Sequence, residues 1–400
     1  MTTTDGQSGN PPKARPPHEA TANTAAAAAV VPSQRVATID WMRGFVMVLM
    51  IIDHASMAFD GTHVATDSAY YPDATTLTQS AFEFLTRWMT HLCAPTFVFL
   101  AGTSLALSIE RRVARGVAAS EIDRSILTRG AIIAVLDLTV ISLGSGHWNF
   151  GVLYAIGLSM ICMTWLRRLP SWGLCAGALG WMALGELVTG AVWSPPGSSS
   201  VLAALTVASY RSDNLTIHYP LVPWLAIMML GWVFGRHLIR YAGGGSRVSG
   251  KAVLWVAGIT GIVVFLVVRY YAGYGDMFLP RADDSWQQWL HVSKYPPSLS
   301  YAALELGILY LCLAALRTLE PRIGVRPNGV LLVFGETAMF YYLVHRMVLE
   351  VPATWFGLRG VGDITTTYVV AAVLLVVLYP ACLWYRGFKK AHRDSILQYF

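Results

Sequence analysis

Apolar segments of about 20 residues recur from residue 38 to residue 386 and are separated by charged or Pro/Gly-rich breaks. A helix of about 20 apolar residues spans the hydrocarbon core of a bilayer. The chain is therefore predicted to be all-α, a polytopic membrane protein with about ten transmembrane helices. The segments lie near 38–58, 82–108, 130–145, 149–166, 172–193, 218–238, 252–271, 298–316, 329–349 and 367–386.

The third and fourth segments leave an alternative open, because only residues 144–149 separate them. A re-entrant hairpin would explain this pair as well as two crossings do. Outside the membrane domain at 35–390, the polar, Pro-rich and Ala-rich residues 1–34 are predicted to be a disordered tail. Residues 391–400 are predicted to be a short cytoplasmic C-terminal tail. The Ala tract before residue 32 is too short to favour a cleaved signal peptide.

Composition agrees with a membrane protein. Charged residues make up 13% of the chain, where a soluble domain has about a quarter. The net charge of +6 is small and dispersed, so no nucleic-acid partner is predicted. The five cysteines lie in apolar runs without a CxxC pair, which argues against a disulfide framework or a metal centre. They are Cys93, Cys162, Cys175, Cys312 and Cys382.

Basic residues gather after every even-numbered segment, whereas the loop at 59–80 has none. By the positive-inside rule, this alternation predicts that both termini are cytoplasmic. The expected location is the plasma (inner) membrane, crossed many times. The basic loop residues include Arg111, Arg112, Arg115, Arg124, Arg129, Arg167, Arg168, Arg236, Arg240, Arg247, Lys251, Arg317, Arg322, Arg326, Arg386, Lys389, Lys390 and Arg393.

Arg43 and His54 in the first segment share one face of the predicted helix. Their separation of eleven residues corresponds to three turns plus about 20°, and to a rise of about 16 Å. Arg43 near the cytoplasmic surface suits a phosphate, and a neutral His54 near mid-membrane suits general-base catalysis. Asp40 lies near Arg43, whereas Asp53 points about 100° away from His54. A snorkelling arginine and an interhelical histidine are the structural alternative.

The second segment carries Glu83, Arg87 and His91. Glu83 and Arg87 have the i,i+4 spacing that predicts an ion pair, and His91 lies one turn further on. Charges inside a membrane are costly and are functional candidates by default. An internal ion pair holding two helices together explains these residues as well as a substrate-lining role does.

His218, Lys294 and His345 are candidates on the outer side. His218 and Lys294 lie just before prolines at the starts of the sixth and eighth segments, where freed backbone carbonyls can meet a ligand. Lys294 suits an anionic or carbonyl group. His345 lies toward the outer half of the ninth segment, where it either completes a polar site or anchors the helix.

Four blocks of the chain together resemble a known enzyme family. The Arg43-x10-His54 pattern is similar to the signature of integral-membrane acyltransferases. More closely, the blocks resemble the bacterial family grouped with the catalytic domain of heparan-alpha-glucosaminide N-acetyltransferase. They are Ile39-Asp-Trp-Met-Arg-Gly44 through His54; His91-Leu-Cys-Ala-Pro95 through Ser104; His218-Tyr-Pro220 through Gly231; and Lys294-Tyr-Pro-Pro-Ser298 with Phe334-Gly-Glu336 through His345.

The resemblance implies an enzyme that takes an acyl group, commonly acetyl, from cytoplasmic acyl-CoA. The group would be delivered to a hydroxyl or amine of a glycan, a lipid-linked acceptor or another envelope molecule on the outer side. Acyl-CoA would be a co-substrate and not a permanently bound cofactor. The oligomeric state stays open, a homo-oligomer included.

By this resemblance, Arg43 and His54 take the arginine and the histidine of the membrane-acyltransferase motif. The other roles are our interpretation of the residues. The phosphates of CoA would lie near Arg43, with Arg111 or Arg112, and the thioester would reach toward His54. His54 would either deprotonate the acceptor for direct transfer or carry the acyl group itself. The acceptor would approach past a polar set on the outer side. The substrate-binding candidates are Asp40, Asp53, Glu83, Arg87, His218, Lys294 and His345.

The chain departs from the family pattern at its histidine motif. Of the family's His-Ala-Ser-Trp-Asn-Gly run, the sequence keeps His54 through Ser56 and departs at Met57 and Ala58. His54 stays the favoured catalytic histidine, but this departure makes His91 a second candidate.

Two other classes of function compete with an acyltransferase. A transporter or flippase for a small anion or a lipid-linked sugar would use the same intramembrane charges without covalent chemistry. A structural or regulatory membrane subunit would leave Arg43 and His54 without a purpose. The enzyme is favoured because the Arg43–His54 face opens toward the cytoplasm.

Overall fold

A computed structural model describes residues 1–2, 36–63, 66–392 and 395 of the chain. Nearly all of the predicted tail at 1–34, and most of the tail at 391–400, lie outside the described residues. The described residues are mostly helical. The helices are α2 (Ala37–Phe59), α3 (Ala81–Thr90), α4 (Cys93–Ala114), α5 (Ala119–Leu136), the π-helix η1 (Asp137–Ile141), α6 (Ser142–Ser145), α7 (Val152–Leu166), α8 (Ser171–Gly190), α9 (Val201–Thr206), α10 (Leu221–Ala242), α11 (Gly250–Tyr271), α12 (Trp286–Leu290), α13 (Leu299–Ile323), α14 (Val330–Glu336), α15 (Ala338–Trp355) and α16 (Ile364–Ala391).

Every predicted apolar segment contains helix. Within the described residues, eight helical stretches are long and apolar enough to cross a membrane. The fourth segment forms α7, a shorter apolar helix of 15 residues. The ninth is broken at Thr337 into α14 and α15. A mostly helical architecture with several helices able to cross a membrane is thus confirmed, while the count of ten and the orientation of the termini stay predictions.

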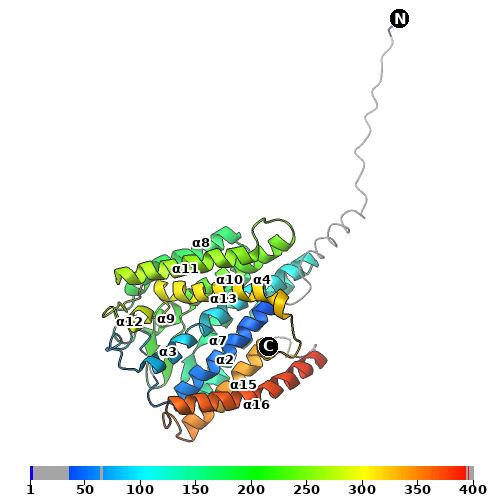
Figure 1. Cartoon of the computed structure of the whole chain (residues 1–400). Coiled ribbons are helices and arrows are strands. Elements are labelled where there is room, and N and C mark those ends of the chain that lie inside the picture. The colour runs from blue at the N-terminus through cyan, green and yellow to red at the C-terminus, as the bar shows by residue number, and fades with distance from the viewer. Residues whose placement is uncertain (3–35, 64–65, 393–394, 396–400) are drawn as a thin grey trace.

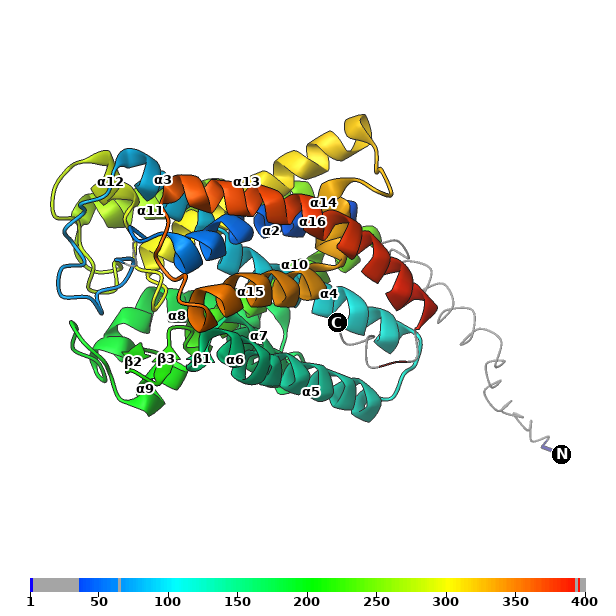
Figure 2. The same ribbon diagram turned by 90° about the horizontal axis from the view of Figure 1, so that it is seen from below.

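A small sheet lies toward one end of the bundle (Figure 2). Its strands β1 (Trp148–Phe150), β3 (Leu215–Ile217) and β2 (Tyr210–Arg211) stand in that order, with β1 parallel and β2 antiparallel to β3. The sequence analysis did not predict these strands. Near β1, buried Asp137 accepts hydrogen bonds from the amides of Gly151 and Tyr154, both at 2.8 Å, and thereby caps α7.

The helix α2 begins, and α16 ends, at the same end of the bundle (Figures 1 and 2). This placement agrees with an even number of crossings. The structure contains no membrane, so the assignment of that end to the cytoplasm rests on the positive-inside rule. The sheet lies toward the opposite end.

Glycines allow α2 to touch α14. A Cβ added to Gly44 would stand 1.9 Å from the carbonyl oxygen of Leu331, and one added to Gly335 would stand 1.9 Å from that of Asp40. No side chain fits in such contacts, so glycine permits the backbones to approach closely. This contact packs α14, which lies just before α15 in the chain, against α2.

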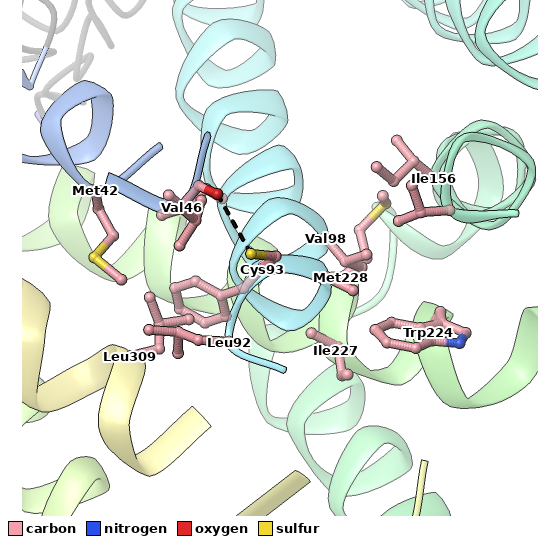
Figure 3. Packing of buried hydrophobic residues seen from close by; sticks show 14 of the residues in the cluster. Met42, Val46, Leu92, Cys93, Val98, Ile156, Trp224, Ile227, Met228 and Leu309 are labelled. Atoms are coloured by element: carbon pink, nitrogen blue, oxygen red, sulfur yellow. Dashed lines mark hydrogen bonds between the residues drawn. The ribbon is translucent and has the colours of Figure 1, made fainter. Parts of the chain in front are cut away.

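The core around α2 and α4 is closely packed (Figure 3). Cys93 donates a hydrogen bond from Sγ to the carbonyl oxygen of Val46 at 3.3 Å. Met42, Leu92 and Leu309 surround this contact and are nearly inaccessible. The cysteines of the described chain are all free, and two of them, Cys93 among them, are buried. Cys93 thus packs within this core.

Candidate active site

Two histidines from distant parts of the chain meet in the interior. Nδ1 of His54, on α2, lies 2.7 Å from Nε2 of His345, on α15. The rings stack with centroids 5.0 Å apart. His345 is completely buried, and its Nδ1 lies 2.7 Å from the carbonyl oxygen of Tyr341. The sequence predicted His345 only as a substrate-binding or anchoring residue.

The carbonyl of Tyr341 determines the tautomers of both neutral rings. A carbonyl oxygen only accepts, so Nδ1 of His345 must donate to it. Nε2 of His345 is then an acceptor, and Nδ1 of His54 must donate to it. The remaining nitrogen of His54, Nε2, therefore carries a lone pair, and it has no partner among the described residues. His54 is half-buried, which leaves part of its ring accessible to a reactant.

A large cavity lies next to this pair. Its volume is about 480 Å³, and Tyr342 forms part of its wall. The ring of Tyr342 meets His54 edge to face with centroids 6.1 Å apart, and it meets His345 in the same way at 5.6 Å. The cavity is therefore separated from the histidine pair by no more than one aromatic side chain.

Besides the acidic residues Asp40 and Glu336, the cavity wall has a cationic part and an apolar part. The cations come from α2, α4, α5 and α16, and the apolar residues come mainly from α4, α5 and α7. The cationic side chains are Arg43, Arg111, Arg115, Arg129 and Lys389. The apolar ones include Met50, Phe97, Leu105, Ile133, Val152, Leu153, Ile156 and Met160.

The side chain of Arg43 makes contacts within the protein and is also partly accessible. It pairs with Asp40 at 2.9 Å and donates to the carbonyl of Leu100 at 3.1 Å and to the hydroxyl of Ser104. The contacts with Leu100 and Ser104 link α2 to α4. Its side chain is still 18% exposed and lines the cavity, so it can also meet an anion.

The other arginine candidates separate into two groups. Arg111 lines the cavity, whereas Arg112 is not among the cavity-lining residues and pairs with Glu121 at 3.1 Å. The sequence analysis used Arg115 and Arg129 only as orientation signals, but both line the cavity. Arg129 has no hydrogen bond or ion pair within the described chain. Their position in the basic loop after the second segment was the sequence feature that could have identified them as candidates for phosphate binding.

A second polar cluster lies around Arg87, on the Asp53 side of α2. Arg87 pairs with Asp53 at 2.6 Å and with Asp67 at 2.7 Å, and His91 Nε2 lies 3.1 Å from Asp67. The predicted Glu83–Arg87 ion pair is not formed, because Glu83 caps α3 through a capping box instead. Asp53 thus turns toward Arg87 and not toward His54.

Asp67, in the loop at 59–80, escaped the sequence analysis. Burial would raise the pKa of its carboxyl, but Arg87 and His91 hold that pKa well below its usual range. Asp67 is therefore an anion that bridges the loop to α3. A single acid in a long polar loop carries no distinguishing pattern, so the sequence offered no signal for it.

Lys294 and His218 lie close to the Arg87 cluster. Lys294 is 2% exposed, its amide donates to the carbonyl of Asp67 at 2.9 Å, and its Nζ lies 5.2 Å from the ring centroid of Tyr295. Burial would lower the pKa of Lys294, but Tyr295, Asp53 and Asp67 raise it, so the ammonium stays charged. The ring of His218 lies against Tyr295. Burial and Arg211 lower the pKa of His218 to about 4, so its ring is neutral.

The predicted site residues thus form two regions. His54 and His345 adjoin the cavity that contains Arg43 and Arg111, while Asp53, Arg87, His91, Lys294 and His218 gather nearer the end with the sheet. Glu83 belongs to a helix cap, and Asp40 supports Arg43. In the part of the chain that the structure describes, no group of His, Cys, Asp and Glu residues could hold a metal ion.

A comparison with known protein families gives a match. A family model described as "Heparan-alpha-glucosaminide N-acetyltransferase, catalytic" matches residues 35–268, more than half of the chain. The matched range contains Arg43, His54 and His91, whereas Lys294 and His345 lie beyond it. No curated protein matches the chain.

Proposed function

Because the chain belongs to the family of the heparan-alpha-glucosaminide N-acetyltransferase catalytic domain, we propose that it is a membrane acetyltransferase that uses cytoplasmic acetyl-CoA. The acetyl group is transferred to an amine or hydroxyl of a glycan or envelope acceptor that approaches from the outer side. The single observation that carries this proposal is the His54–His345 pair beside a cation-lined cavity.

The cavity suits the shape and charge of acetyl-CoA. CoA has a phosphorylated nucleotide at one end and an uncharged arm that ends in the thioester. Arginine binds phosphate through paired N–H groups, and five cationic side chains line this cavity. The apolar residues of the wall suit the arm. Its thioester end would then lie near Tyr342, beside His54.

His54 acts as the general base in this proposal. Its free Nε2 takes the proton of the acceptor amine or hydroxyl while the nucleophile attacks the thioester carbonyl carbon. The tetrahedral intermediate collapses with cleavage of the C–S bond, and CoA leaves as a thiolate that receives the proton from His54. Direct transfer needs no acyl-enzyme intermediate, and the lone pair on Nε2 supports it.

His345 is a positioning residue. It accepts the Nδ1–H of His54 at 2.7 Å and is itself fixed by the carbonyl of Tyr341. This chain of hydrogen bonds keeps the lone pair of His54 on Nε2, and it stabilises the imidazolium that forms during transfer. The arrangement performs the task that a carboxylate performs in a catalytic triad, but with uncharged groups, which suits the membrane interior.

The Arg87 cluster is the proposed side of acceptor approach. Small pockets on either side of Arg87 are lined by Asp53 and His63, and by Asp67 and His91. Lys294 supplies a buried cation nearby. His91 lies against Asp67 and not against the cavity, so it fits acceptor binding better than base catalysis.

The proposal is tested with purified full-length protein in detergent, labelled acetyl-CoA and glucosamine as a trial acceptor. We expect release of free CoA and appearance of labelled acetylglucosamine, and we expect both to be lost in His54→Ala. Accumulation of unmodified substrate inside proteoliposomes, with no cleavage of the thioester, would instead support a transporter.

A further inference from the structure

The hydroxyl of Tyr342 stands out among the groups around the histidine pair. Tyr342 is 8% exposed and lines the cavity, yet its hydroxyl has no hydrogen bond within the described chain. The nearby tyrosines are satisfied: Tyr341 donates to the carbonyl of Met47 at 3.1 Å, and Tyr301 donates to that of His91 at 3.0 Å. Tyr342 is not among the residues with a fully buried polar atom that lacks a partner, so its hydroxyl stays accessible and can meet a reactant in the cavity that the side chain lines.

Neighbouring elements hold the ring of Tyr342 firmly. It meets His54 and His345 edge to face, at 77° and 80°, and both partners are themselves linked by a hydrogen bond. The side chain therefore occupies one position between the cavity and the proposed base. A donor fixed in advance in this way loses little freedom when a reactant arrives.

Acyl transfer requires a donor at this place. When the acceptor attacks the thioester carbonyl carbon, the carbonyl π electrons move to its oxygen, which becomes an oxyanion. The oxyanion needs a hydrogen-bond donor within about 3 Å. His54 cannot serve, because its Nδ1–H is bound to His345 and its Nε2 takes the acceptor proton.

We propose that Tyr342 is a catalytic residue whose hydroxyl donates a hydrogen bond to the thioester oxyanion. The phenol keeps its own proton throughout. It donates weakly to the ground-state carbonyl and more strongly to the oxyanion, and it is released when the C=O bond re-forms and the C–S bond breaks. This role rests on the proposed function and adds a group that the base-catalysed mechanism leaves out.

The test is Tyr342→Phe in the full-length protein, with acetyl-CoA as donor and glucosamine as acceptor. The change removes one oxygen atom and keeps the ring contacts with both histidines. We expect kcat to fall by about a hundredfold to a thousandfold, as for the loss of one oxyanion donor. The Kd for acetyl-CoA should stay within about threefold, because the cations of the cavity are untouched.

Tyr154→Phe is the matched control. Tyr154 is also buried, but its hydroxyl donates to the carbonyl of Leu205 at 3.2 Å and lies outside the proposed machinery. Its loss should change kcat by less than about threefold. A kcat loss in Tyr342→Phe of less than about tenfold overturns the oxyanion role. So does a weakened Kd with unchanged kcat, which would make Tyr342 a wall of the cavity.

The failure of this role is distinguishable from the failure of the proposed function. If the wild-type protein releases no thiol from acetyl-CoA, the acetyltransferase proposal fails, and the Tyr342 role fails with it. If the wild type is active and His54→Ala is inactive while Tyr342→Phe retains its kcat, only the Tyr342 role fails.

Discussion

Nδ1 of His54 and Nε2 of His345 lie 2.7 Å apart although 291 positions separate the two residues in the chain. The carbonyl of Tyr341 makes this contact directional, since it obliges His345 to donate from Nδ1. One helix therefore supplies the proposed base, and a helix from the other end of the sequence sets its tautomer.

Replacement of His345 should lower turnover and leave donor binding intact. His345→Ala removes the acceptor of the His54 Nδ1–H, so Nε2 is no longer held as the free base. We expect kcat to fall about tenfold to a thousandfold, with the Kd for acetyl-CoA unchanged, by comparison with the loss of the orienting group in a triad. His345→Gln, whose amide oxygen can accept the same proton, should recover part of the loss. Equal losses in both variants would indicate a packing role only.

The sequence indicated much of this architecture because its signals are local. Apolar length predicted the membrane helices, and helical spacing placed Arg43 and His54 on one face of α2. The contact of His54 with His345 depends on how α15 follows the break at Thr337, which no local pattern reports. The donation of Arg87 to Asp53 and Asp67, in place of Glu83, likewise depends on a loop folding back over α3.

The cation-lined cavity provides a test between Arg129 and Arg112. Arg129 lines the cavity and has no hydrogen bond or ion pair with any residue that the structure describes, so Arg129→Ala should weaken acetyl-CoA binding by about tenfold to a hundredfold, the value of one charge-assisted contact. Arg112→Ala should change the Kd by less than about twofold, because Arg112 pairs with Glu121 instead. Isothermal titration with acetyl-CoA measures both. A larger increase of the Kd in Arg112→Ala than in Arg129→Ala would show that the CoA phosphates bind outside this cavity.

Asp67 should make the stability of the protein pH-dependent at the acidic end. Its folded-state pKa is depressed, so its stabilising contribution is complete above the unfolded pKa of about 4 and declines as pH falls below it. Asp67→Asn breaks a buried ion pair and should cost about 3–5 kcal/mol at pH 7. In thermal unfolding experiments in detergent, the loss of stability of Asp67→Asn relative to the wild type should become smaller between about pH 4 and about pH 3.

Asp73→Asn is the control for Asp67, since Asp73 is an exposed acid of the same loop. It should leave the unfolding temperature almost unchanged at every pH. A deficit in Asp67→Asn that is the same at all pH values would show that the carboxylate charge is not what stabilises the loop.

Gly44 should tolerate no side chain. Gly44→Ala places a Cβ 1.9 Å from the carbonyl oxygen of Leu331, so α14 must shift away from α2, at a cost of about 1–3 kcal/mol. Because α15 follows α14 directly, acetyl transfer should fall as well. Gly387→Ala is the control, since nothing lies within 4 Å of its added Cβ. Melting curves and activity assays on the pair should therefore differ, and similar values in the two variants would contradict the close contact.

The proposed base itself is tested by His54→Asn. Asparagine keeps a similar size and some hydrogen bonding but cannot accept the proton, so transfer should fall by about two to four orders of magnitude. Acetyl-CoA should still bind, because Arg43 lies about 16 Å away along the helix. Wild-type kcat should decline toward acidic pH, where a protonated imidazole no longer serves as a base.

His91→Asn, assayed in parallel, should change acceptor KM more than kcat, because His91 lies against Asp67. If His91→Asn is inactive and His54→Asn is active, the base lies on the second segment, and if both transfer normally, neither histidine performs the chemistry.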